Sequence, residues 1–82
     1  MTTDVQAKEL KEVIRANIVA RRAELGLTQT EVAEAAGVTQ PYITQIETGL
    51  KVPAIEVLAS ISEALRTTPS ALMTPEIFSK TG

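Results

Sequence analysis

Three glutamines, Gln29, Gln40 and Gln45, carry the side chains in this sequence best suited to recognising a polar polymer. An amide both donates and accepts hydrogen bonds, so it pairs with the edge of an adenine base through two bonds. Hydroxyl-bearing residues lie beside them, at Thr39, Tyr42, Thr44 and Thr48. Their carbon surfaces suit a thymine methyl group. The pattern favours base recognition over an ordinary solvated helix face, which is more often rich in Lys and Glu.

The residue types needed for catalysis are scarce. The chain has no histidine and no cysteine, so the commonest general base, the commonest metal ligand and a thiolate metal site are all missing. Ten carboxylates remain, but a working pair needs a cleft, and a chain of 82 residues hardly has the size to form one. We therefore expect no enzyme activity, no metal, no cofactor and no small-molecule ligand.

Two short predicted helices joined by a tight turn position the glutamines. Residues 28–31 read Thr-Gln-Thr-Glu, a capping box in which the first hydroxyl and the last carboxylate each bond a backbone N–H. Gly37 suits the left-handed residue that ends a helix. Thr39 caps the next helix, and the proline two positions later is tolerated in the first turn. Residues 28–49 therefore predict a helix-turn-helix unit.

Three further helices follow from apolar spacing. A first helix of about 20 residues ends at Gly26; its apolar face carries Leu10, Val13, Ile14, Ile18 and Leu25. A fourth begins near Ala54, and its apolar stripe carries Ile55, Leu58, Ile61 and Leu65. A short fifth helix follows Thr68, and a last turn would hold Ile77 and Phe78. No segment alternates with period two, so the predicted class is all-α.

A single domain is expected over residues 4–73, with residues 74–82 as a short C-terminal extension. No apolar run approaches the ~18 residues of a membrane span, and the polar N-terminus lacks a signal-peptide pattern. These features are typical of a cytoplasmic protein.

The charge of the chain argues mildly against a nucleic-acid partner. The net charge is −2, and residues 28–52 carry one cation, Lys51, against Glu31, Glu34 and Glu47. Neutralised phosphates supply much of the affinity for DNA, so one copy should bind weakly and two copies on one site are needed. Further candidate phosphate contacts lie on the first helix, at Lys8, Lys11, Arg15 and Arg21.

Residues Ile18 to Met73, about two thirds of the chain, resemble the phage-repressor and Cro-like helix-turn-helix domains, the XRE family. The matching residues keep the family spacing without a gap: Ile18, Arg22, Gly26-Leu27-Thr28-Gln29, Val32-Ala33, Ala36-Gly37-Val38-Thr39-Gln40, Ile43, Ile46-Glu47, Gly49, Pro53, Leu58 and Ala64-Leu65. The resemblance implies a five-helix, lambda-repressor-like fold. Its third helix would enter the major groove, usually in a two-fold dimer on a near-palindromic operator.

The same resemblance implies roles for individual residues. Base edges would be read by Gln40, Pro41, Thr44 and Gln45. Contacts to the DNA backbone are expected from Gln29, Thr39, Tyr42, Thr48 and Lys51. Pro41 departs from the common polar residue and could offer only a van der Waals contact. Arg22 and Glu47 occupy positions that pair in the family as a largely buried ion pair, which gives Glu47 a structural role.

Two functions remain open at this point. The intact glutamine set favours a sequence-specific transcriptional regulator, a repressor, whereas the acidic charge favours a protein-interaction module of the antitoxin or co-activator type. The dimer surface is open as well. The N-terminal extension, with Val5, Leu10, Val13 and Ile14, or the C-terminal segment, with Leu72, Met73, Ile77 and Phe78, could form it or fold back onto the core.

Overall fold

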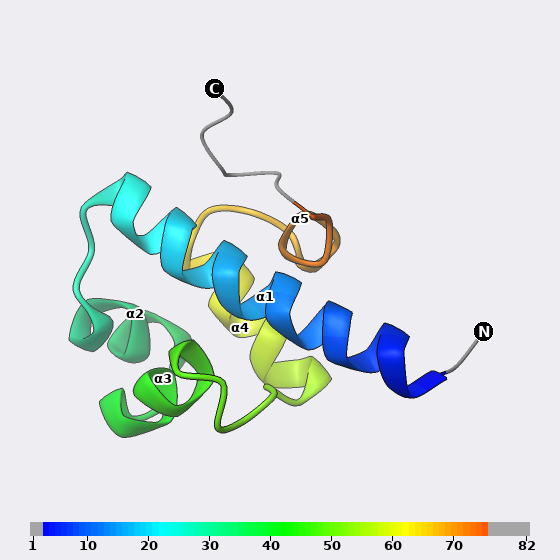
Figure 1. The fold of residues 1–82 in the computed structure, drawn as a ribbon. Helices are drawn as coiled ribbons and strands as arrows, with labels where there is room; N and C mark the ends of the chain where they lie inside the picture. Colours follow the sequence, from blue (N-terminus) through cyan, green and yellow to red (C-terminus); the bar gives the residue numbers. More distant parts are fainter. Residues whose placement is uncertain (1–2, 76–82) are drawn as a thin grey trace.

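The computed structural model describes the backbone of residues 3–75 and the side chains of residues 9–75. This part of the chain folds into five helices and no strand (Figure 1): α1 (Thr3–Leu25), α2 (Gln29–Ala36), α3 (Gln40–Glu47), α4 (Ile55–Ala64) and α5 (Pro69–Leu72). The predicted all-α class with a long first helix is confirmed. No helix in the described range has the length and apolar character that a membrane span requires.

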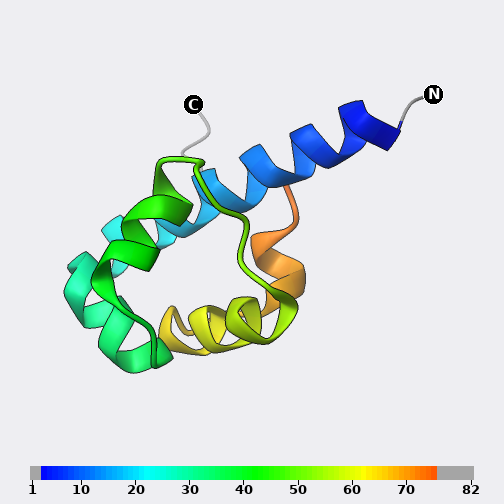
Figure 2. The same cartoon turned by 90° about the horizontal axis from the view of Figure 1, so that it is seen from below.

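The long helix α1 is the support against which the shorter helices pack. It contacts α3 and α5, while α2 contacts α3 and α4, and α5 also contacts α4. Figures 1 and 2 show the N-terminal part of α1 extending beyond the other helices, away from the α2–α3 pair. The helix that was expected to read bases is therefore held from two sides, by α1 and by α2.

An aliphatic core joins all five helices. Its fully buried apolar side chains include Ile18, Val32, Ile43, Ile46, Ile61, Leu65 and Leu72. Burying one such side chain is worth about 1.5–3 kcal/mol, so this set accounts for much of the stabilisation available to so small a domain. The 3–4 spacing in the sequence predicted Ile18, Ile61 and Leu65 among these positions correctly.

Two apolar residues assigned to helix faces by their spacing are exposed instead. Ile55 was expected on the inner stripe of the fourth helix, yet it is 74% exposed. It is the first residue of α4, directly after the N-cap Ala54, and within residues 3–75 no other helix covers that end of the stripe. Leu10, in the N-terminal half of α1, is 42% exposed. Spacing identifies a shared face but not how far a neighbour covers it.

The sequence pattern did not predict the buried polar residue Asn17, which is 4% exposed. Its Nδ2 donates to the carbonyl oxygens of Leu72 at 2.9 Å and Thr74 at 2.8 Å. Buried polar groups are nearly always paired in this way. The two bonds tie the end of α5 to the middle of α1. The expected last turn with Ile77 and Phe78, like Val5, lies outside the residues and side chains described here.

Candidate nucleic-acid interface

The first turn of α2 is capped as the sequence predicted. Thr28 Oγ1 accepts from the N–H of Glu31 at 3.0 Å, and the Glu31 carboxylate accepts from the N–H of Thr28 at 2.8 Å. By position, the N–H groups of Gln29 and Thr30 have no intrahelical acceptor. They lie at the positive end of the helix dipole, which favours an anion such as a phosphate.

The turn between α2 and α3 fixes the angle of the second helix. Gly37 adopts φ 76°, a left-handed conformation that costs a residue with a Cβ about 1–2 kcal/mol. The N–H of Val38 then bonds back to Ala33 O at 2.9 Å. Thr39 caps α3 by accepting from the N–H of Tyr42, and Pro41 lies in the first turn. Two helices expected from short-range signals are therefore found with the expected caps.

The side chains of Gln29, Gln40 and Thr44 form one hydrogen-bonded cluster between α2 and α3. Gln40 Nε2 donates to Gln29 Oε1 at 2.8 Å and to Thr44 Oγ1 at 2.7 Å. The Thr44 hydroxyl also donates to Gln29 Oε1 at 2.7 Å. Both N–H groups of Gln40 are thus engaged, and its Oε1 remains as an acceptor. All three residues are half-buried, so their side chains are held in place before any ligand arrives.

Glu47, at the end of α3, anchors this cluster. Arg22 Nε donates to Glu47 Oε2 at 2.7 Å and Arg22 Nη2 to Oε1 at 3.0 Å, a two-bond geometry typical of arginine and carboxylate. Gln29 Nε2 donates to the same Oε1 at 2.8 Å. The hydrogen bond to Glu47, helped by its negative charge and opposed by burial, raises the pKa of Arg22. The Arg22 guanidinium therefore stays charged at neutral pH.

A second arginine of α1 holds the same end of α3 through the backbone. Arg15 Nη1 donates to the carbonyl oxygen of Glu47 at 3.2 Å, and Glu12 accepts from the other side of its guanidinium.

A third arginine of α1, Arg21, donates to the carbonyl oxygens of Leu65 and Arg66 at the end of α4. Arg15 and Arg21 were both expected as phosphate contacts, and no spacing in the sequence indicated these structural bonds. Because these two arginines already bond to other parts of the protein, fewer cations of α1 could serve DNA binding alone.

The remaining candidate residues of α3 are not part of the cluster. Within the described residues the Gln45 side chain forms no hydrogen bond. Pro41 and Thr48 are exposed, and the Thr48 hydroxyl donates to Thr44 O at 2.9 Å. Tyr42 packs against the core. Thus only part of the predicted polar set is preorganised.

The cation expected at the DNA backbone lies beside an aromatic ring. Lys51 Nζ is 5.8 Å from the centre of the Tyr42 ring, within the range of a cation–π contact. Lys51 itself is exposed. This contact keeps the only cation of residues 28–52 close to the surface of α3.

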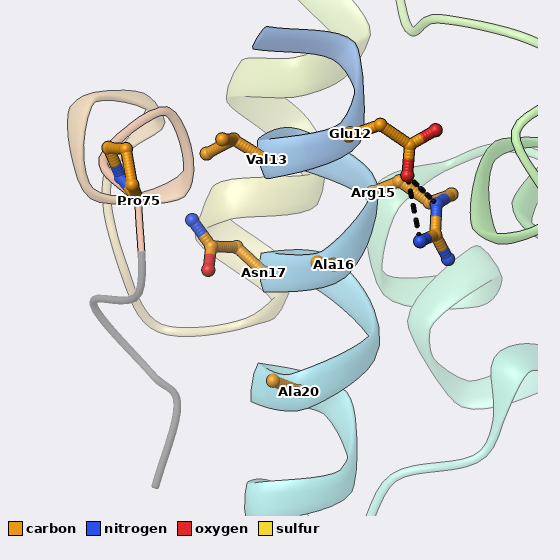
Figure 3. Close-up of a pocket in the computed structure, with 7 residues that line it drawn as sticks. All are labelled: Glu12, Val13, Arg15, Ala16, Asn17, Ala20 and Pro75. Carbon is orange, nitrogen blue, oxygen red and sulfur yellow. Dashed lines mark hydrogen bonds and ion pairs between the residues drawn. The ribbon is translucent and has the colours of Figure 1, made fainter. Parts of the chain in front are cut away.

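A hollow of about 420 Å³ lies along α1, and none of its lining residues belongs to α2 or α3. It is lined by Glu12, Val13, Arg15, Ala16, Asn17, Ala20 and Pro75. Figure 3 shows Val13 and Asn17 directed toward Pro75, with the paired Glu12 and Arg15 on the other side of the helix. The Asn17 donors are bound to carbonyl groups, so within the described residues they are not available to a ligand in this hollow.

Residues 18–72 match the helix-turn-helix family. That range is more than half of the chain, and it holds every residue of the Gln29–Gln40–Thr44 cluster and the Arg22–Glu47 pair. The chain belongs to the XRE-type helix-turn-helix family. The resemblance inferred from the sequence is thereby confirmed.

Proteins similar to this chain include HTH-type transcriptional regulators. It is 31% identical over 67 residues to an uncharacterized HTH-type transcriptional regulator of Sinorhizobium fredii, y4dJ, and the match covers 82% of this chain and 87% of that protein. It is 36% identical over 55 residues to an uncharacterized HTH-type transcriptional regulator of Mycobacterium tuberculosis, Rv0474. This second match covers 67% of the chain but only 39% of the relative. The mycobacterial protein is thus much longer than the shared region.

Solved structures of similar proteins have the same fold. The DNA-binding domain of the P22 C2 repressor superposes with a TM-score of 0.76 at 30% identity, covering 84% of this chain and 90% of that one. The clp gene regulator ClgR of C. glutamicum gives a TM-score of 0.71 at 35% identity, covering 77% and 82%. These similarities confirm the lambda-repressor-like architecture of the helices.

Proposed function

We propose that this chain is the DNA-binding unit of a sequence-specific transcriptional regulator in the cytoplasm. It acts as a repressor and binds a near-palindromic operator as a dimer, with α3 in the major groove. The observation that carries the proposal is the cluster of Gln29, Gln40 and Thr44, because it fixes polar side chains of the two helices against each other. Family membership and the likeness to a repressor domain support it.

Gln29 and the start of α2 contact a phosphate. One N–H of the Gln29 amide is bound to Glu47, and the second is available to a phosphate oxygen. The backbone N–H groups of the first turn add donors that need no side-chain movement. Such contacts position α3 in the groove without carrying sequence information.

Gln40 and Gln45 read bases in different ways. Because both Gln40 N–H groups are engaged, its free Oε1 accepts from the exocyclic amino group of adenine or cytosine. The Gln45 amide has both its donors and its acceptor available, so it forms the two-bond pair with adenine. Thr44 supplies its methyl group and fixes Gln40, and Pro41 offers an apolar contact. Thr39, Tyr42, Thr48 and Lys51 then face the DNA backbone.

A dimer compensates for the small number of cations. With one cation in residues 28–52, few counterions are released per copy, and log K falls with log salt by only about 0.9 for each phosphate neutralised. Two copies on one operator add their base contacts as well as their phosphate contacts. Specific affinity therefore depends more on base reading than on electrostatic attraction.

Selection of bound sequences from random double-stranded DNA, repeated at two salt concentrations, tests the proposal. We expect an enriched palindrome with the same bases at both salt concentrations and a shallow loss of affinity with salt. The acidic charge favours the alternative, a protein-interaction module with weak or no DNA binding. If no sequence is enriched at either salt concentration, that alternative replaces the proposal.

A further inference from the structure

Exposed large apolar residues gather directly after α3. In the described part of the chain, three of the four most exposed ones lie within six consecutive positions: Leu50 at 76%, Val52 at 53% and Ile55 at 74%. We call these three residues the connector patch. Figure 2 shows the whole connector that carries it, from the end of α3 to the start of α4. Such clustering marks an interaction site more often than scattered apolar residues do.

The connector patch is fixed rigidly to α3. The N–H groups of Leu50 and Lys51 both donate to the carbonyl oxygen of Gln45, at 2.8 and 3.1 Å. Pro53, in the middle of the connector, is buried. The patch therefore moves with the base-reading helix, and little conformational entropy would be lost when a partner covers it.

We propose that the connector patch is the surface by which two copies of this chain meet on the operator. This inference rests on the proposed DNA-binding function and names the contact that the dimer uses. A two-fold contact uses the same surface patch on both copies. Leu50, Val52 and Ile55 of the two copies would then form one apolar core at the dyad.

Charge and size favour a second copy as the occupant. The patch lies beside one cation, Lys51, and one anion, Glu56, both exposed, so this surface has no net charge that would repel a second copy of itself. Apolar side chains offer nothing to a phosphate. The molecule measures 39 × 30 × 19 Å, and half-sites one turn apart are separated by ~34 Å. Two copies in successive major grooves are therefore close enough for segments next to α3 to touch.

The contact is expected to be weak away from DNA. Three side chains per copy provide less than the ~1,200 Å² of a stable interface, and association carries a large entropic cost. DNA removes much of that cost by holding both copies on one duplex. The patch should therefore appear chiefly as cooperativity between the two half-sites.

The test compares Leu50→Glu and Ile55→Glu with Leu10→Glu, the same kind of change at an exposed apolar residue outside the patch. Each protein is titrated onto a duplex holding the selected palindrome and onto one holding a single half-site. Both patch positions are exposed, so thermal unfolding should change little. We expect cooperativity on the palindrome to fall about tenfold or more, which corresponds to 1.4 kcal/mol. Half-site affinity should stay within about twofold for both patch variants, and Leu10→Glu should match wild type on both duplexes.

Retained cooperativity in both patch variants, or its loss in Leu10→Glu alone, would overturn the inference. Sedimentation of the protein without DNA, up to millimolar concentration, tests the dimer surface separately from the DNA-binding proposal. If no duplex is preferred but self-association is lost in Ile55→Glu, the surface stands and the DNA-binding function fails. If wild type binds its half-sites independently and stays monomeric, the surface fails and DNA reading stands.

Discussion

The side-chain amide of Gln29 donates to Glu47 Oε1 at 2.8 Å. This bond links the expected phosphate contact on α2 to the carboxylate that Arg22 holds at 2.7 Å. Glu47 therefore does more than join α1 to α3. It also orients the amide from which Gln40 and Thr44 take their positions. Under the proposed function, one buried carboxylate couples stability to DNA recognition, and the first prediction concerns that coupling.

Glu47→Gln should destabilise the domain strongly, because Arg22 keeps its charge but loses its anion. Removing one partner of a buried pair costs about 3 kcal/mol, and each kcal/mol lowers Tm by roughly 4–8 °C in a domain of this size. Thermal unfolding measures the effect. The matched control is Glu34→Gln, the same change at an exposed residue of α2, for which Tm should hardly move. Equal melting of the two variants would contradict a structural role for the pair.

Gln45→Ala should remove base preference while leaving stability unchanged, since its side chain forms no hydrogen bond within the described residues. A two-bond base contact is worth about 1–3 kcal/mol of discrimination. Gln40→Ala should lower preference too, and also weaken binding to every sequence, because Gln29 loses a partner that orients it. Titrations of the selected duplex and of a scrambled one separate these effects. Unaltered preference in both variants would rule out base reading by these glutamines.

Thr44→Val should change which base is preferred rather than abolish binding. The substitution keeps the shape but removes the hydroxyl that accepts from Gln40. One Gln40 N–H is then free to join its Oε1 in a two-bond pair, so preference should shift toward adenine. The lost bonds should cost about 1 kcal/mol of stability.

Sequence selection with the Thr44→Val variant provides the measurement. Thr48→Val is its control, because within the described residues the Thr48 hydroxyl bonds only to carbonyl groups in the last turn of α3. An identical base profile for Thr44→Val and wild type would show that the hydroxyl does not restrain Gln40.

Asn17→Leu should loosen α5 from α1. The carbonyl oxygens of Leu72 and Thr74 lose their donor, and an unpaired buried polar group costs about 1–3 kcal/mol. Asn17→Asp should be worse, since it sets a carboxylate against those carbonyls. Hydrogen exchange of the α5 amides and thermal unfolding report the change. Wild-type stability in the Asp variant would show that Asn17 does not anchor α5.

The sequence by itself determined the helices, the turn and the family. The Thr28 capping box, the left-handed Gly37 and the Thr39 cap act over four residues or fewer, so their outcome does not depend on the rest of the fold. Apolar spacing likewise predicted Ile14, Ile18, Leu58, Ile61 and Leu65 in the core, because one face of a helix repeats every three or four residues.

Only the tertiary structure decided which side chains meet. Gln29 and Glu47 are 18 positions apart, and Asn17 and Thr74 are 57 apart; no local signal relates such residues. The spacing that placed Ile55 on an apolar stripe could not show that this end of α4 lacks a neighbour. Periodicity specifies the direction of a side chain, whereas packing specifies its partner. For that reason the glutamines were predicted from the sequence, and the cluster that holds two of them was found only in the fold.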